Sequence, residues 1–218
     1  MFEEMEPKKK NSKMLTLLAV FVLLVTVVGV SVAAYTWTFT GGTNQIGTGN
    51  IAMSLLESTD VIDIQNALPQ SDTAGRNQSD YFDFAVTTSA SGAPGNITYS
   101  ISVTKVAADT GYTLLQDNQV KIYMTTFTGS GNNITETQVV AAKKVSEVIT
   151  SGDSGVLTFD SGKTSYLTHT HTTTGQQQTT KYRLRMWVSS DTDASSWTSA
   201  TKLQYKLKVS VSGSLVAA

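Results

Sequence analysis

The feature that most restricts how this chain can fold is an uncharged run from Met14 to Ala34, preceded by lysines at positions 8, 9, 10 and 13. The run has 21 residues. As a helix rising about 1.5 Å per residue it would span roughly 30 Å, which matches the hydrocarbon core of a bilayer. Because a helix satisfies every backbone polar group within its own segment, we interpret residues 14–34 as a transmembrane or signal helix.

The lysines on the N-terminal side of this run predict that residues 1–13 are cytoplasmic and that everything from Tyr35 onward is exported. Val32 and Ala34, or alternatively Ser31 and Ala33, are small enough to serve a signal peptidase at its −3 and −1 sites. The apolar core of a signal peptide is usually about 7–15 residues, which is shorter than this run. Cleavage would give an extracellular protein, whereas retention would give a single-pass protein on the cell surface, and both alternatives stay open.

The composition of the exported part points to strands and excludes some partners. After residue 34 there are 12 Lys and Arg against 14 Asp and Glu, so no basic surplus is present to neutralise phosphates, which argues against nucleic acid as a partner. The chain has no cysteine, so an exported fold must be held by packing, by a metal or by assembly. The 31 threonines and 22 serines in this part favour strands and turns, respectively.

Strict alternation of apolar and polar residues recurs along the chain from residue 49 to residue 218. It is clearest at 97–106, 182–188 and 203–211, where one face is apolar and the other polar. About nine such segments occur without intervening helical periodicity. The sequence therefore predicts an all-β ectodomain at 49–218, an antiparallel β-sandwich or jelly roll.

An extended segment at residues 35–48 precedes this body. Tyr35, Trp37 and Phe39 alternate with threonines, and Gly41 and Gly42 follow as a hinge. Such an apolar strand needs the edge of its own sheet, the sheet of another chain, or the membrane interface. We interpret these five residues as a candidate donor strand for assembly.

The order of several short pieces resembles a known family. These pieces are Ala33-Ala34-Tyr35 at the end of the lysine-flanked run, then 49–54 (GNIAMS), 66–69 (NALP) and the aromatic strand at 81–84 (YFDF). They resemble the TasA/camelysin family of exported jelly-roll proteins, which form biofilm matrix fibres and have relatives among pilus subunits. The resemblance implies a self-assembling homopolymer in which the segment after the signal peptide completes the sheet of a neighbouring subunit.

Little in the chain indicates chemistry. His169 and His171 could place two imidazoles on one side of a strand and bind a divalent metal, but spacing supplies no third ligand and His-Glu-x-x-His is absent. We expect a solvated loop at 168–180 instead, with no metal and no cofactor. No nucleophile with its base, no paired carboxylates and no phosphate loop can be assembled, so we do not expect an enzyme.

Arg183, Arg185 and Trp187 share one face of a predicted strand, where a guanidinium could stack on the indole. This face could bind a polysaccharide or another partner, or it could be ordinary cross-strand packing, which we favour. The function that the sequence favours is an exported structural protein that self-assembles. The alternative is a monomeric β-sandwich ectodomain that stays on its membrane helix and mediates binding or adhesion.

Overall fold

The computed structural model describes residues 36–40, 44–48, 51–57, 61–90, 95–131, 133–161, 167–172, 175–197 and 202–216. The predicted helix at 14–34 lies outside the described residues, as do Tyr35, Gly41 and Gly42. The chain divides into two compact units, residues 1–36 and 37–218, and the fold below is that of the second unit. None of the helices among the described residues has the length and apolar character needed to cross a membrane.

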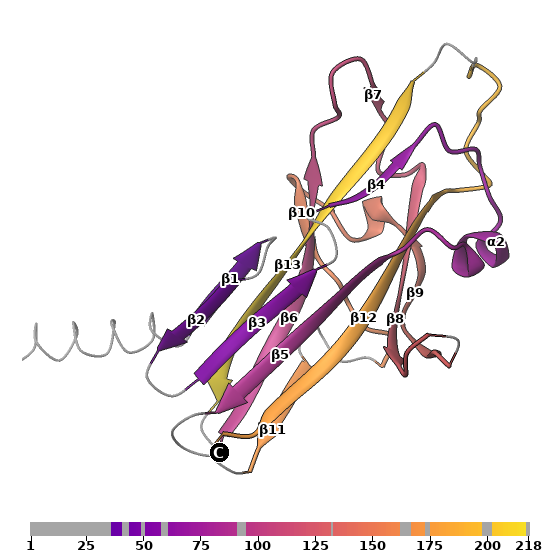
Figure 1. The fold of residues 1–218 in the computed structure, drawn as a ribbon. Helices are drawn as coiled ribbons and strands as arrows, with labels where there is room; N and C mark the ends of the chain where they lie inside the picture. The colour runs from indigo at the N-terminus through magenta and orange to yellow at the C-terminus, as the bar shows by residue number, and fades with distance from the viewer. Residues whose placement is uncertain are drawn as a thin grey trace, which may run out of the picture. The chain divides into compact units, whose positions relative to one another are not determined.

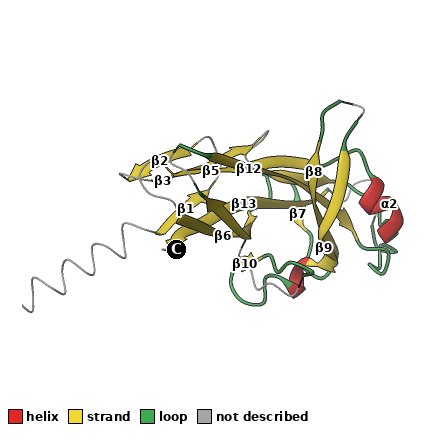
Figure 2. Ribbon diagram, turned by 90° about the horizontal axis from the view of Figure 1, so that it is seen from below, coloured by secondary structure: helices red, strands yellow, loops and turns green. Residues whose placement is uncertain are grey.

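The second unit is an antiparallel β-sandwich of jelly-roll type, with two stacked sheets (Figure 2). Sheet A has the order β1-β13-β6-β10, with β11 also beside β6, and β4 and β7 also beside β13. Its strands are β1 (Thr36–Thr40), β4 (Ile62–Gln65), β6 (Gly95–Val106), β7 (Thr113–Leu114), β10 (Ser154–Val156), β11 (Leu167–His171) and β13 (Leu203–Val216).

Sheet B has the order β2-β3-β5-β12-β8-β9. Its strands are β2 (Asn44–Thr48), β3 (Ile51–Glu57), β5 (Phe82–Ala90), β8 (Val120–Thr128), β9 (Thr135–Lys144) and β12 (Gln177–Val188). The chain crosses repeatedly between the sheets, for example from β3 to β4 to β5 to β6 (Figure 1). Two short helices complete the described residues, α2 (Asp72–Asn77) and the 3-10 helix η1 (Val145–Glu147).

The core lies between the sheets and consists of the residues that the alternation pattern placed inward. Burying such a side chain contributes roughly 1.5–3 kcal/mol, so these rows hold the two sheets together without a disulfide. The prediction of an all-β antiparallel fold is thereby confirmed. The fully buried members of these rows are Val86, Ile97, Tyr99, Ile101, Val103, Ile122, Met124, Tyr182, Leu184, Met186, Val188, Tyr205, Leu207, Val209 and Val211.

Two segments acquire a definite structure that the sequence pattern did not give them. Residues 138–149 are mainly strand, because β9 continues to Lys144 before η1 begins. The segment after Pro69 contains α2. Its first turn is capped by Ser71 Oγ, which accepts a hydrogen bond from the Ala74 amide at 3.2 Å. Helix α2 covers part of the outer face of sheet B.

Candidate functional site

The candidate donor strand lies at the edge of sheet A as β1, and β13 is its hydrogen-bonded neighbour. β6 and β7 pair with one edge of β13 between Leu203 and Val216. β4 covers the opposite edge from Gln204 to Leu207. β1 therefore occupies the remainder of that opposite edge, C-terminal to Leu207. For Trp37 and Phe39 the structure gives the position of the backbone only, so their apolar face stays a prediction.

A network of ion pairs, which we call the outer charged network, lies on the outer face of sheet B. Arg183 donates through Nε and Nη2 to the two carboxylate oxygens of Asp83, both at 2.8 Å, and through Nη1 to Glu136 Oε1 at 2.8 Å. Arg185 donates to both oxygens of Glu136 at 2.7 and 2.9 Å, and to the Gln78 carbonyl at 3.2 Å. The protein's own acceptors thus occupy both guanidinium groups, which favours cross-strand packing over an external ligand.

The Arg183 guanidinium stacks on Tyr81 instead of on Trp187. The Cζ atom of Arg183 lies 3.5 Å from the centre of the Tyr81 ring. Trp187 is fully buried beneath α2, where a Cβ added at Gly75 would lie 2.2 Å from the indole. The pattern placed Trp187 on the correct face of β12. It could not show that α2 would cover the indole and that Tyr81, next to β5, would cover Arg183.

The outer charged network holds Glu136 strongly in its ionised form. Hydrogen bonds from Arg185 first, and from Thr125 and Arg183 as well, lower the pKa of Glu136 to about 2. Hydrogen bonds to Asp83 raise the pKa of Arg183 further above its usual range. Each buried positive charge therefore faces a carboxylate, as buried ion pairs require.

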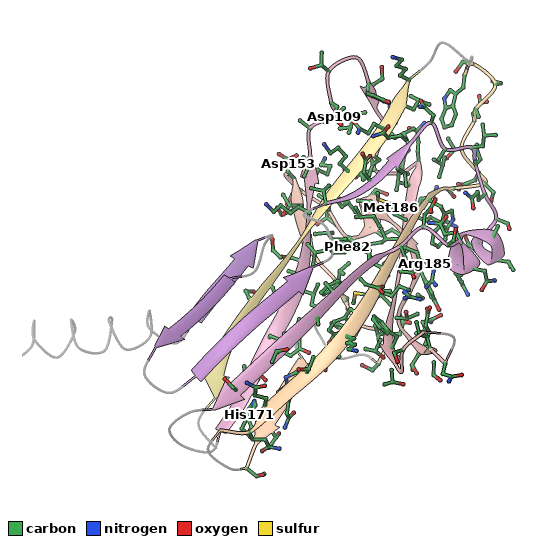
Figure 3. All side chains as sticks on the ribbon, in the orientation of Figure 1. Phe82, Asp109, Asp153, His171, Arg185 and Met186 are labelled. Atoms are coloured by element: carbon green, nitrogen blue, oxygen red, sulfur yellow. The ribbon has the colours of Figure 1, made fainter. Side chains whose placement is uncertain are left out.

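The expected solvated loop at 168–180 is wrong for most of its length. Residues 167–171 form β11, which pairs antiparallel with β6, and β12 begins at Gln177. His169 and His171 are buried, with 7% and 1% of their surfaces exposed. The cause is the period of two in this segment, because the two imidazoles occupy the inward positions that apolar residues fill in the other strands. Figure 3 shows His171 at the end of the sandwich where β11 lies.

The two histidines converge on one hydroxyl group of the facing sheet. Thr88 Oγ1 on β5 lies 2.7 Å from His169 Nδ1 and 2.9 Å from His171 Nε2. The second nitrogen of each ring has its own partner, Thr180 Oγ1 at 2.9 Å for His169 and the Gln176 carbonyl at 2.9 Å for His171. These contacts connect β11 in sheet A to β5 and β12 in sheet B.

Two phenols extend the same cluster toward the apolar core. Tyr99 Oη lies 2.8 Å from Tyr182 Oη and 3.4 Å from His169 Nε2. Burial raises the pKa of both phenols, and burial first, with the neighbouring His171 second, lowers the pKa of His169. We call this cluster the buried polar network, with the members Thr88, Tyr99, His169, His171, Thr180 and Tyr182.

The chemistry of the buried polar network is that of neutral donors and acceptors. Within the described ranges, no three His, Cys, Asp or Glu side chains are grouped so that they could hold a metal ion. The absence of a metal and of a cofactor stays a prediction from the sequence.

Sequence reasoning missed the partners that complete both networks. Asp83 and Glu136 were not singled out, although each is a charged residue in or next to a β-type segment. Nothing in the sequence distinguishes Thr88 from the other threonines of the strand segments. The signal that could have found these partners is a charged or polar residue at a covered position of a strand. To use this signal one must know how the strands are aligned with one another.

The comparisons with known proteins give no family. No protein-family model matches the sequence, and no curated protein matches it. Among solved structures, the chain is similar to one described as "Crystal structure of infectious bursal disease virus VP2 subviral particle", with 10% identity and a TM-score of 0.29. The match covers 84% of this chain and 32% of that chain, so this chain spans about a third of the viral protein's length. The fold assignment therefore rests on the strand pairing described above.

Proposed function

We propose that this chain is an exported cell-surface structural protein that self-assembles into a fibre or pilus-like homopolymer. In the polymer, the segment from Tyr35 to Thr40 leaves its own sandwich and pairs with β13 of a neighbouring copy. Residues 14–34 direct export and are removed before assembly. The subunit performs no catalysis, and its partner is a second copy of the same chain.

The observation that carries this proposal is the position of β1. It is an edge strand beside β13, and β4 covers only Gln204 to Leu207 of that edge. A strand that hydrogen-bonds to one neighbour can be replaced by the same strand of another copy without loss of ladder hydrogen bonds, which is the basis of strand exchange. Departure of β1 would leave an open edge on β13, and open edges are templates for a strand from another chain.

The composition of β1 supports the same interpretation. Trp37 and Phe39 alternate with threonines, and burying each ring contributes roughly 1.5–3 kcal/mol, so a released strand gains stability by entering another sandwich. Gly41 and Gly42 follow directly and impose few restrictions on the backbone. The exported part carries a small net charge, so electrostatic repulsion between identical subunits is weak.

The test is to delete residues 35–40 from the chain that begins at Tyr35, and separately to change Trp37 and Phe39 to Ser. Exchange predicts that the deleted form stays folded and forms no polymer in electron micrographs, and that an added peptide of residues 35–40 caps the intact subunit. Loss of the fold on deletion would make β1 an obligate strand of its own sandwich. Unchanged polymers would contradict the proposal.

The alternative function is a monomeric ectodomain that remains on its membrane helix and binds a ligand. The feature that favours it is a cleft between β4 and the start of β5, with apolar residues such as Ile62, Phe82 and Met186 and with Asp63 and Asp80 in its lining. The intrachain pairing of β1 with β13 suits a closed monomer as well. N-terminal sequencing of protein from the source cells separates the two functions, because the polymer subunit should begin near Tyr35 and the anchored ectodomain should retain residues 14–34.

A further inference from the structure

We propose that the two histidines form an acid-sensitive latch that fastens β11 to the opposite sheet, and that their protonation releases β11 from the sandwich. The inference rests on the directions of the hydrogen bonds in the buried polar network and on the absence of any opposing charge in it. It does not depend on the proposed function.

The hydrogen bonds fix the proton positions of the neutral network. The Gln176 carbonyl can only accept, so His171 carries its proton on Nδ1 and its Nε2 must accept from the Thr88 hydroxyl. Since Thr88 has one proton and donates it to His171, it accepts from Nδ1–H of His169. His169 Nε2 is then an acceptor and receives the proton of Thr180 Oγ1. Every group in this series of hydrogen bonds has a partner when both rings are neutral.

An added proton places a positive charge on one of the imidazoles, and the buried polar network contains no carboxylate to balance it. One proton on His171 can be accommodated by reversing the hydrogen bonds toward His169, but the resulting cation remains buried. A second proton makes both rings donate to Thr88 and brings two cations around one oxygen atom. Burial of an uncompensated cation is costly, so protonation favours a conformation in which the rings reach water.

The groups that face the two rings come from three strands and from Gln176, the residue before β12, whose carbonyl accepts from His171. β5 contributes Thr88, β6 contributes Tyr99, and β12 contributes Thr180, while Tyr182 of β12 lies next to Tyr99. The titratable members of this set are the two phenols, whose pKa values burial raises, so they stay uncharged at the pH where histidine titrates. Within the described part of the chain, no carboxylate hydrogen-bonds to either ring.

β11 is the strand that can separate from the sandwich. It is a five-residue strand that pairs with the edge of β6 from Gly95 to Tyr99, and its inward side chains include the two histidines. Short edge strands open locally at lower free energy than central strands such as β12. Release of β11 would leave the 95–99 edge of β6 unpaired.

The test is hydrogen exchange of the full-length chain at pH 7.5 and pH 5.0, with rates corrected for the intrinsic effect of pH. If one histidine with an ordinary pKa of about 6.5 takes a proton only in the open state, the opening constant rises by up to about 30-fold between these pH values. We expect this loss of protection at residues 95–99 and 167–171, while central β12 keeps its protection. Equal protection at both pH values, or a uniform loss throughout the domain, would overturn the latch.

The matched variant replaces His169 and His171 together with Gln, which donates and accepts hydrogen bonds but does not titrate. The chain has two histidines in all, so this variant removes every imidazole. Its exchange pattern should be the same at pH 5.0 and pH 7.5, and a retained pH response would contradict the proposal. If the variant does not fold, the ring nitrogen shifts of the wild-type protein decide, because the latch requires Nδ1–H tautomers for both rings at pH 7.5.

Discussion

The outer charged network and the buried polar network both satisfy side chains that are covered from water, the first with opposite charges and the second with neutral hydrogen bonds. On the outer face of sheet B, Arg183 and Arg185 are almost completely buried. Asp83 and Glu136 form ion pairs with them. Between the sheets, His169 and its partners are uncharged groups arranged as alternating donors and acceptors. A covered cation is stable where carboxylates face it, whereas an imidazole without a carboxylate must remain neutral. The two regions should therefore fail under different mutations and at different pH values.

The largest effect should come from removing the carboxylate that the two arginines share. Glu136→Gln places a neutral amide against the guanidinium groups of Arg183 and Arg185. The amide NH2 then faces N–H donors, and the Arg185 cation loses its carboxylate partner. Loss of one member of a covered ion pair costs about 3 kcal/mol, which urea unfolding would measure. The control is Asp153→Asn, because the Asp153 side chain is 79% exposed and its pair with Lys105 should contribute less than about 1 kcal/mol. Equal losses for the two variants would mean that the outer network is no stronger than a surface ion pair.

The next largest effect should come from the hydroxyl that both imidazoles share. Thr88→Val keeps the shape of the side chain but leaves His169 Nδ1 and His171 Nε2 without their common partner, at a cost of about 2 kcal/mol in the free energy of unfolding. Thr87→Val is the control on the same strand, because its hydroxyl bonds to Thr179 in an exposed position and its loss should cost less than about 1 kcal/mol. A small effect at Thr88 would show that the interior network is not required for stability.

The pH dependence of stability separates the two networks without mutation. Burial lowers the pKa of His169 in the folded state, so its contribution is complete above about pH 6.5 and is lost as the pH falls below that value, by at most about 1.4 kcal/mol per pH unit. Glu136 has a folded pKa of about 2 against an ordinary 4.5, so its contribution is present above pH 4.5 and is lost as the pH falls toward 2. Urea midpoints measured from pH 7.5 to pH 3 should begin to fall below about pH 6.5, and the loss from Glu136 should add to this below pH 4.5. A single fall confined to the range below pH 4.5 would contradict the role given to the histidines.

The smallest effect should come from chelation. The buried polar network is satisfied by protein groups alone, so EDTA should leave the unfolding midpoint unchanged within about 0.5 kcal/mol. The measurement is a pair of urea titrations with and without EDTA, together with metal analysis of the purified protein. Stoichiometric zinc that is lost when both histidines are replaced would reverse this prediction.

The fold could be predicted where one chemical rule decided the structure. In β6 and β13, apolar residues at every second position specified both the strand and its buried face. In β11 the same period was present, but histidines occupied the inward positions between threonines, and polar composition suggested a loop. Whether an inward imidazole is acceptable depends on Thr88, which lies 81 residues away from His169 in the sequence.

The contacts of the outer face were also beyond sequence reasoning, for the same physical reason. Alternation placed Arg183 and Arg185 on one face of β12, yet their partners come from β5 and β9. Strand register and sheet order decide which charges meet, and a single sequence specifies neither of them directly. The position of β1 beside β13 could not be predicted from the sequence either, because an edge strand could pair within its own chain or with another.

The most direct test of strand exchange uses the absence of cysteine from the chain. Two variants, Thr38→Cys in β1 and Ser212→Cys in β13, are mixed, allowed to assemble and treated with a short thiol-specific cross-linker. Strand exchange predicts cross-linked dimers that contain one copy of each variant, and a control with Asp153→Cys in place of Ser212→Cys should give few. If the mixture gives no cross-links above this control while a chain carrying both cysteines links within itself, β1 belongs to its own sandwich and the proposed assembly is contradicted.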